Sequence, residues 1–441
     1  MSAAGQAKEI THRRVFLTAF PIVLSNATVP ILGAVDTGVV GQLGEAAPIG
    51  AVGIGATIIT FFYWAFGFLR MGTAGMAAQA IGARDHDEVT ALLVRGLLIA
   101  AAAGIGIFAL QIPLFWLGFQ VSPASQDVEN LARDYMSVRV WGAPAAIGAY
   151  AITGWLVAAE RTREVLILQL WINGLNIVLD IWFVLGLGWG VEGVALATII
   201  AEWSGLTLGL WMCRAAFTGT AWKDRTLILM PDRLKKMAVV NTDIMIRSVL
   251  LLIGFSSFTM RGAAFDDVTL AANQILIQFL FITAHAMDGF AFASEALIGN
   301  AMGAKDRKRL RRAAIIASQW SFLTVCLLAV IFWLFGQTII DVMTTSPDVR
   351  LAAYTFLIWM VIAPPLGMPS WILDGIFIGA TRTRDMRNAM IVSLALYLVA
   401  LATLPEVFGN HGLWAALILF FIFRGATLAR KYPALEAAAE R

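Results

Sequence analysis

The sequence predicts an all-α polytopic membrane protein with twelve transmembrane helices in two pseudo-symmetric six-helix bundles. Three observations predict this class: an apolar composition, basic residues confined to alternate connections, and an internal repeat. Of the 441 residues, 59% are hydrophobic and 14% are charged, whereas a soluble domain carries about 25% charged residues. The composition excludes a soluble globular enzyme, a disordered protein and a nucleic-acid binder of the usual basic kind.

Apolar runs of membrane-spanning length follow one another along the chain. A run of about 20 apolar residues crosses the bilayer as a helix, because every backbone polar group is then bonded within the segment. The first run is a retained span rather than a cleaved signal peptide, since it contains Pro21, Pro30 and Asp36. The predicted spans are 15–40, 48–80, 90–117, 128–157, 165–186, 190–213, 240–262, 268–300, 313–337, 350–379, 388–405 and 411–429.

Basic residues gather in alternate connections between these spans. Lys and Arg cluster at the N-terminus, near the C-terminus and in every second loop, whereas the loops around 41–47, 118–127, 186–190, 338–349 and 405–411 contain neither. The positive-inside rule assigns the basic side to the cytoplasm. We therefore expect both termini to lie in the cytoplasm.

An internal repeat relates the two halves of the chain. GARD, which starts at Gly82, matches GAKD, which starts at Gly303, an offset of 221 (303 − 82). GWLVAAERTRE from Gly154 matches GIFIGATRTRD from Gly375 at the same offset. We predict an N-terminal six-helix lobe at 1–213, a basic linker at 214–239 and a C-terminal six-helix lobe at 240–441. Six spans per half give both lobes the same orientation, as in parallel-repeat transporters.

Ionisable and amide side chains inside the spans mark candidate functional residues, because burying such groups in a bilayer is costly. Asp36 lies in the first span, six residues after Pro30. That proline removes a helix hydrogen bond and predicts a hinge. In the fifth span, Asn176 lies one turn before Asp180 on the same helix face.

These residues are not duplicated by the repeat. At the offset of 221, the residues Asp36, Asn176, Asp180 and Glu202 fall on Ser257, Tyr397, Leu401 and Phe423. An acidic set in one half is hard to explain as a requirement of a fold that both halves share. We interpret it as a cation site of two carboxylates, an amide and a hydroxyl, formed by Asp36, Asp180, Asn176 and Thr198.

Two cations suit this candidate site. Hard oxygen ligands suit Na⁺, by analogy with the oxygen cages of Ca²⁺, and a buried carboxylate pair also holds H⁺. The alternative is that each acid merely bonds a neighbouring polar group. Candidates for a second polar site are Asp288, Glu295, Asp374 and Glu202. Their role could be a proton relay, part of the substrate-binding wall or salt bridges, and the sequence does not choose among these. Asp243, one turn before Arg247, predicts an internal ion pair.

Several motifs together resemble one transporter family. The segments VDTGVVGQLG, FLRMGTAGMAAQAIGARD, GWLVAAERTRE and DGFAFASEALIGNAMGAKD resemble the multidrug and toxic compound extrusion (MATE) family, and within it the branch of DNA-damage-inducible protein F (DinF). The resemblance covers essentially the whole chain. It implies a V-shaped, twelve-helix transporter of a bacterial-type inner membrane that exports amphipathic, mostly cationic compounds in exchange for a cation.

The resemblance also implies roles for individual residues. The family's first-span aspartate takes up the proton as the span bends at its proline, which carries over to Asp36 and Pro30. Similar prokaryotic members place an Asp, Asn, Asp and Thr cation site in the first half. Those positions match Asp36, Asn176, Asp180 and Thr198 here. Other branches use acids of the seventh span, where this chain has only Asp243.

These observations predict a secondary active transporter that works by antiport with H⁺ or Na⁺. We expect no cofactor beyond the transported ion. The expected partners are small amphipathic substrates and membrane lipids, without nucleic acid, and the expected state is a monomer. The alternative is a flippase for lipid-linked precursors. Such a protein needs a cationic cleft, and the intramembrane residues Arg70, Arg139 and Arg247 could contribute to one. An enzyme is disfavoured, because the chain has no HExxH motif, no GxSxG within a span and no histidine paired with a nucleophile.

Overall fold

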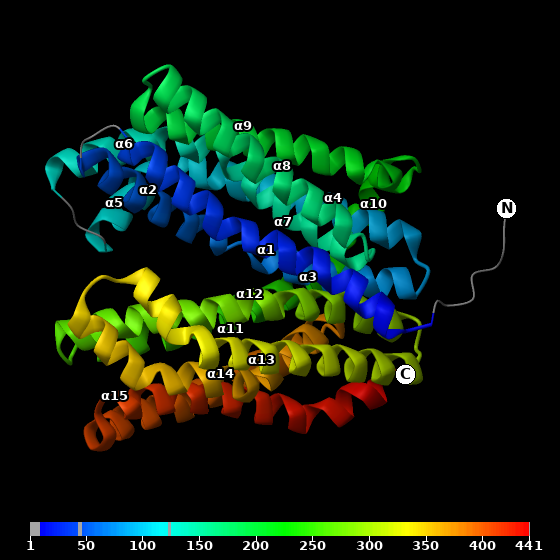
Figure 1. Cartoon of the computed structure of the whole chain (residues 1–441). Coiled ribbons are helices and arrows are strands. Elements are labelled where there is room, and N and C mark those ends of the chain that lie inside the picture. The colour runs from blue at the N-terminus through cyan, green and yellow to red at the C-terminus, as the bar shows by residue number, and fades with distance from the viewer. Residues whose placement is uncertain (1–8, 43–45, 122–124, 441) are drawn as a thin grey trace. The chain divides into compact units, whose positions relative to one another are not determined.

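The computed structural model describes residues 9–42, 46–121 and 125–440, and within these ranges the chain is helical and contains no strand (Figure 1). Ten helical stretches there are long and apolar enough to cross a membrane. One of them, α15 (Thr383–Ala438), joins two helices across a kink at Gly409. Helix α1 (His12–Gly41) adds a further 30-residue helix, about 45 Å long. The prediction of twelve spans is confirmed.

The chain divides into two compact units. The N-terminal unit comprises Leu24–Ile81 and Asp85–Met237, and the C-terminal unit comprises Met1–Val23, Gly82–Arg84 and Ala238–Arg441. Helix α1 therefore contributes residues to both units. Residues 214–237, within the predicted linker, pack with the N-terminal unit.

The N-terminal unit contains nearly all of the short helices in the described ranges. Beside part of α1, its helices are α2 (Ala46–Trp64), α3 (Phe68–Gly82), α4 (His86–Ala109), α5 (Gln111–Val121), α6 (Gln126–Arg139), α7 (Ala143–Ala158), α8 (Thr162–Asp180), α9 (Gly190–Met212) and α10 (Arg225–Ile228). Short segments of other helix types are η1 (Val140–Gly142), the π-helical η2 (Ile181–Gly186), η3 (Arg214–Phe217) and η4 (Ala221–Lys223). The predicted span 48–80 is in fact two helices, because a tight turn at 65–67 separates α2 from α3.

The C-terminal unit consists of long helices. They are α11 (Pro231–Gly262), which begins in the N-terminal unit, α12 (Asp267–Gly303), α13 (Arg307–Met343), α14 (Pro347–Gly379) and α15. Its core is aromatic and aliphatic, with Trp414, Phe279, Phe332 and Phe420 fully buried. A reciprocal amide pair between Asn273 and Asn410, at 2.7 and 2.9 Å, ties α12 to the part of α15 that follows the kink.

The repeat is visible in the backbone of the loops. The described non-glycine residues with positive φ are Arg84, Glu160, Lys305 and Thr381, at 60°, 57°, 54° and 50°. They form two pairs separated by the offset of 221, and Gly188 and Gly409 form a third, with φ of 71° and 55°. Each member of the first two pairs sits where a helix ends in a left-handed residue. The predicted duplication is confirmed.

A buried arginine anchors the basic segment between the two halves. Arg95 of α4 is 2% exposed. Its Nε donates to the Ile228 carbonyl at 2.8 Å, and its Nη2 donates to the Leu227 carbonyl at 2.7 Å. Its Nη1 also pairs with Glu88 at 2.8 Å. These bonds satisfy the carbonyls of the last two residues of α10, so the segment is held against α4.

Candidate functional site

Asp36 of α1 and Asp180 at the end of α8 bring two carboxyl groups within hydrogen-bonding reach of each other inside the N-terminal unit. Asn176, one turn earlier on α8, donates from Nδ2 to Oδ2 of Asp180. Asn176 and Asp180 are fully buried. The structure thus brings together three of the four residues predicted to form the cation site.

Each of these three side chains keeps one oxygen without a hydrogen-bond partner. The atoms are Asp36 Oδ1, Asn176 Oδ1 and Asp180 Oδ1, all buried. Buried polar atoms are nearly always bonded, so these acceptors favour a donor or a cation between the two carboxyl groups. A proton or a small cation would satisfy them. Within the described ranges, no group of three or more His, Cys, Asp or Glu side chains could hold a metal ion, so an amide would have to complete such a site.

Thr198 and Pro30, the two other predicted members of this region, are placed differently. The Thr198 hydroxyl donates to the Val194 carbonyl of its own helix α9 at 3.0 Å. In the described contacts it has no bond to Asp36, Asn176 or Asp180. Pro30 is exposed and lies within α1, which continues as a helix through it.

A polar stripe continues along α8 beyond the predicted residues. Asn173 is buried and donates to the Thr28 hydroxyl of α1 at 2.7 Å. Gln169 in turn donates to Asn173 at 3.0 Å. Sequence reasoning missed these residues, although a signal existed. Residues 169, 173, 176 and 180 are spaced by four, three and four, which places them on one helix face.

A buried ion pair lies close to the carboxyl pair. Arg139 of α6 donates from both terminal nitrogens to the two carboxylate oxygens of Glu202 on α9, each at 2.9 Å. The Tyr63 hydroxyl donates to the Arg139 carbonyl at 2.9 Å. Arg139 is near enough to act electrostatically on Asp36. Glu202 is engaged on both oxygens and neutralises Arg139, and no ion pair to Asp36 or Asp180 is found among the described residues.

Two buried acids of the C-terminal unit, Asp374 and Asp243, are paired with arginines. Asp374 of α14 accepts from Arg247 of α11 and, at 2.6 Å, from Arg424 of α15. Asp243 accepts from Arg387 at 2.6 Å and from Thr383 at 3.1 Å. The predicted ion pair between Asp243 and Arg247 is therefore wrong. Although the two are one turn apart on α11, each finds a partner on another helix.

The two remaining candidates for a second polar site lie on α12. Glu295 is buried, at 1% exposure, and Asp288 is half-buried. They are two turns apart on the same helix. Both belong to the C-terminal unit, whereas Asp36 and Asp180 belong to the N-terminal unit.

Twelve spans in duplicated halves, with buried polar clusters inside them, define a polytopic membrane transporter. A sequence model of the family described as MatE matches residues 21–182 and, a second time, residues 244–404. The chain belongs to this family, that of the multidrug and toxic compound extrusion transporters. Its members are transporters rather than enzymes and need no cofactor.

Individual relatives and solved structures agree with this assignment. The chain is 39% identical to DNA damage-inducible protein F of Escherichia coli over 420 residues, covering 93% of this chain and 90% of that protein. It is 24% identical to "Probable multidrug resistance protein NorM" of Synechococcus, covering 94% and 92%. The MATE transporter VcmN of Vibrio cholerae in its bent form has the same fold, with a TM-score of 0.86 at 20% identity, covering 97% of each chain.

Proposed function

We propose that this protein is a secondary active transporter that exports amphipathic, mostly cationic organic compounds by antiport with H⁺ or Na⁺. Family membership supports transport of such compounds, and the name of the Synechococcus relative supports multidrug efflux. The proposed coupling site is in the N-terminal lobe, at Asp36, Asn176 and Asp180, with Thr198 of α9 as a fourth ligand when the site is loaded.

The observation that carries this proposal is the set of three buried, unbonded oxygens around the two carboxyl groups. Two carboxylate charges this close repel strongly in a medium of low dielectric. Binding one proton or one Na⁺ removes that repulsion and bonds the orphaned acceptors. The acids of the C-terminal unit offer no such site at Asp374 or Asp243, because arginines already neutralise them.

Coupling follows if the cation and the cargo favour different states. With the site loaded, Asp36 is neutralised, α1 rearranges about Pro30, and a cationic cargo loses its electrostatic attraction and leaves. With the site empty, the carboxylates attract the next cargo molecule. Each ligand must bind the two states with different affinity, or no exchange results.

The proposed arrangement in the cell follows the charge pattern of the loops. Both termini and the basic linker 214–239 lie in the cytoplasm, and the protein sits in an inner membrane as a monomer of two lobes, residues 1–213 and 240–441. Small amphipathic molecules and lipids are its partners.

The flippase alternative receives less support. A flippase for pyrophosphate-linked lipids needs a cationic cleft. Arg139 is neutralised by Glu202, and Arg247 is engaged by Asp374. These two arginines were among the residues that kept the alternative open.

Efflux of a fluorescent cationic dye from proteoliposomes tests the proposal, with a proton gradient and a Na⁺ gradient imposed separately. We expect one gradient to drive efflux by the wild-type protein and Asp36→Asn to abolish that drive. Ser257→Asn is the matched control, since it creates the same residue at the equivalent position of the other half. Its gradient-driven efflux should match the wild type.

Three outcomes contradict the proposal. If neither gradient moves the dye, the antiport itself is wrong. If Asp36→Asn retains the drive, the coupling site lies elsewhere. If Asp36→Asn and Ser257→Asn fail equally, the loss is not specific to the carboxyl pair.

A further inference from the structure

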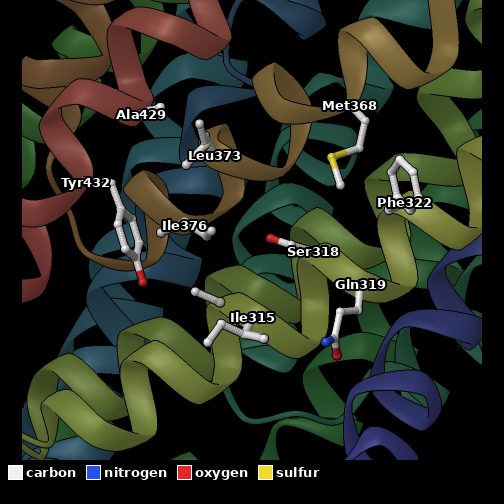
Figure 2. A pocket seen from close by; sticks show the side chains of 10 residues that line it. Ile315, Ser318, Gln319, Phe322, Met368, Leu373, Ile376, Ala429 and Tyr432 are labelled. Atoms are coloured by element: carbon white, nitrogen blue, oxygen red, sulfur yellow. The ribbon is translucent and has the colours of Figure 1, made fainter.

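A cavity of about 570 Å³, open to the surroundings, is formed by α13, α14 and α15 of the C-terminal unit (Figure 2). Its walls are mainly apolar, with Ile315 and Phe322 on α13 and Met368 and Leu373 on α14. Figure 2 shows these side chains around one space, with Tyr432 of α15 on the opposite side from Met368. The volume falls within the range of about 300–1,000 Å³ that is usual for ligand pockets.

The cavity lies near one end of the spans. Helix α13 has 37 residues and is about 55 Å long, which exceeds the bilayer hydrocarbon thickness of about 30 Å. Ile315 lies eight residues after the first residue of α13, about 12 Å along its axis. With α13 centred in the bilayer, about 12 Å of the helix lies outside the hydrocarbon core at each end, so we infer that the cavity begins where lipid headgroups meet acyl chains.

Basic residues precede the lining residues at this end of the cavity. Arg311 lies on α13 one turn before Ile315, and Arg430 and Lys431 directly precede Tyr432 on α15. Arg311 acts electrostatically on the Tyr432 hydroxyl, so it lies close to the cavity wall. Glu436 accepts from Arg311 at 2.7 Å and also from a second arginine of α13 at 2.8 Å. That second arginine, Arg307, also pairs with Glu440 at 3.4 Å, so two carboxylates balance these two arginines.

Two of these basic residues face the surroundings. Arg430 and Lys431 are exposed, and no ion pair to either is found among the described residues. A positive rim beside an apolar cavity at headgroup depth complements an anionic amphiphile, because basic pockets between membrane helices bind acidic lipid headgroups. It repels the cationic cargo proposed for the transporter.

We propose that this cavity binds one acyl chain of an anionic phospholipid, whose phosphate lies against Arg430 and Lys431. The site is separate from the carboxyl pair of the N-terminal unit. The proposal does not rest on antiport, because lipid binding is measured without any gradient.

Native mass spectrometry of the delipidated, detergent-purified protein tests this site, with phosphatidylglycerol and phosphatidylcholine added separately. We expect the wild-type protein to retain one phosphatidylglycerol in preference to phosphatidylcholine. Replacing both Arg430→Gln and Lys431→Gln should weaken phosphatidylglycerol binding about 25-fold, since each basic side chain near a membrane surface contributes about fivefold. The double variant Lys235→Gln, Lys236→Gln removes two adjacent exposed charges outside the C-terminal unit's cavity and should bind like the wild type.

A second pair of variants tests the cavity itself. Ser318→Trp fills the space and should abolish binding of both lipids, whereas Leu323→Trp, on an exposed part of the same helix, should leave binding unchanged. Equal binding of the two lipids by the wild type overturns the proposal. So does wild-type affinity in the Arg430 and Lys431 variant, or displacement of the lipid by the cationic dye, which would mark a cargo site.

Discussion

The Tyr397 hydroxyl lies 3.5 Å from the hydroxyl of Ser257 and donates to the Gly254 carbonyl at 3.1 Å. The repeat makes Tyr397 and Ser257 the equivalents of Asn176 and Asp36. In the C-terminal unit, neutral hydroxyls occupy these positions, whereas in the N-terminal unit they belong to a cluster with two carboxyl groups. The same duplicated scaffold thus supports a neutral packing contact in one half and a charged cluster in the other.

Tyr397→Phe should lower the free energy of unfolding by about 1 kcal/mol and leave coupling intact. The substitution removes one buried hydrogen bond and one long contact without changing the ring. Thermal unfolding in detergent measures the first effect, and gradient-driven dye efflux measures the second. A loss of coupling with normal stability would mean that the C-terminal half takes part in cation exchange.

Asp180→Asn should weaken cation binding at least a hundredfold. Removing one unit charge about 4 Å from a bound cation costs on the order of 4 kcal/mol at an intermediate dielectric. The coupling-ion concentration that gives half-maximal dye efflux reports this change. Asp134→Asn, which removes an exposed carboxylate of α6, controls for net charge and should behave like the wild type. Unchanged ion dependence in Asp180→Asn would remove Asp180 from the site.

Arg139→Gln should destabilise the protein by about 3–5 kcal/mol, because it leaves Glu202 as an uncompensated buried charge. The double variant Arg139→Met, Glu202→Leu should recover most of that loss, since it removes both charges. Unfolding of the three proteins measured side by side gives the comparison. If the double variant is no more stable than the single one, the pair contributes more than mutual neutralisation.

Arg95→Gln should release the segment around α10 from α4. The shorter amide cannot satisfy both backbone carbonyls and Glu88 together. Limited trypsin digestion should then cleave at Arg225 and Lys235 several times faster than in the wild type. Arg163→Gln, at an exposed arginine with no recorded ion pair in the described chain, should leave the digestion pattern unchanged at these sites. Equal rates for Arg95→Gln and the wild type would contradict the anchoring role.

Asp266 caps α12 and should make a contribution to stability that depends on pH. Its carboxylate accepts from the Thr269 hydroxyl at 2.7 Å and from the Thr269 backbone at 2.9 Å, and these bonds hold the pKa of Asp266 below its ordinary range. The contribution is therefore present above the unfolded-state pKa of about 3.9. It is lost as pH falls through the lower folded-state value.

The difference in unfolding temperature between the wild type and Asp266→Ala measures this effect. It should be constant above about pH 5 and shrink on acidification. If the difference in unfolding temperature grew at low pH, the ionised Asp266 carboxylate would not be the form that stabilises α12.

Most of the fold could be predicted because each span carries its own signal. Hydropathy and the Lys and Arg pattern located the spans, and the repeat paired the halves. The turn at 65–67 was not predicted, because apolar residues on both sides conceal a break. Arg95 holds residues around α10 in the N-terminal unit, and its bonds to the Leu227 and Ile228 carbonyls have no sequence signal.

Only those contacts of the candidate site that lie within a single helix could be predicted from spacing. Asn176 and Asp180 could be placed together because they are one turn apart on α8. That Asp36 meets Asp180 depends on how α1 packs against α8, which no local pattern specifies. The same limit explains the wrong pairing of Asp243 with Arg247, since spacing along α11 carries no information about arginines and acids on other helices.

The π-helical segment Ile181–Gly186 begins directly after Asp180. A π turn contains one residue more than the regular α-helical turn and is used mostly in short pieces at functional sites. One residue of an α-helix corresponds to about 100° of rotation. If this segment became regular α-helix, the extra residue would shift toward the C-terminus. The polar face of α8 would then rotate relative to the residues that follow Gly186. Asp180 thus lies at a junction where a small change in helical winding would change the direction of its carboxylate without breaking the helix.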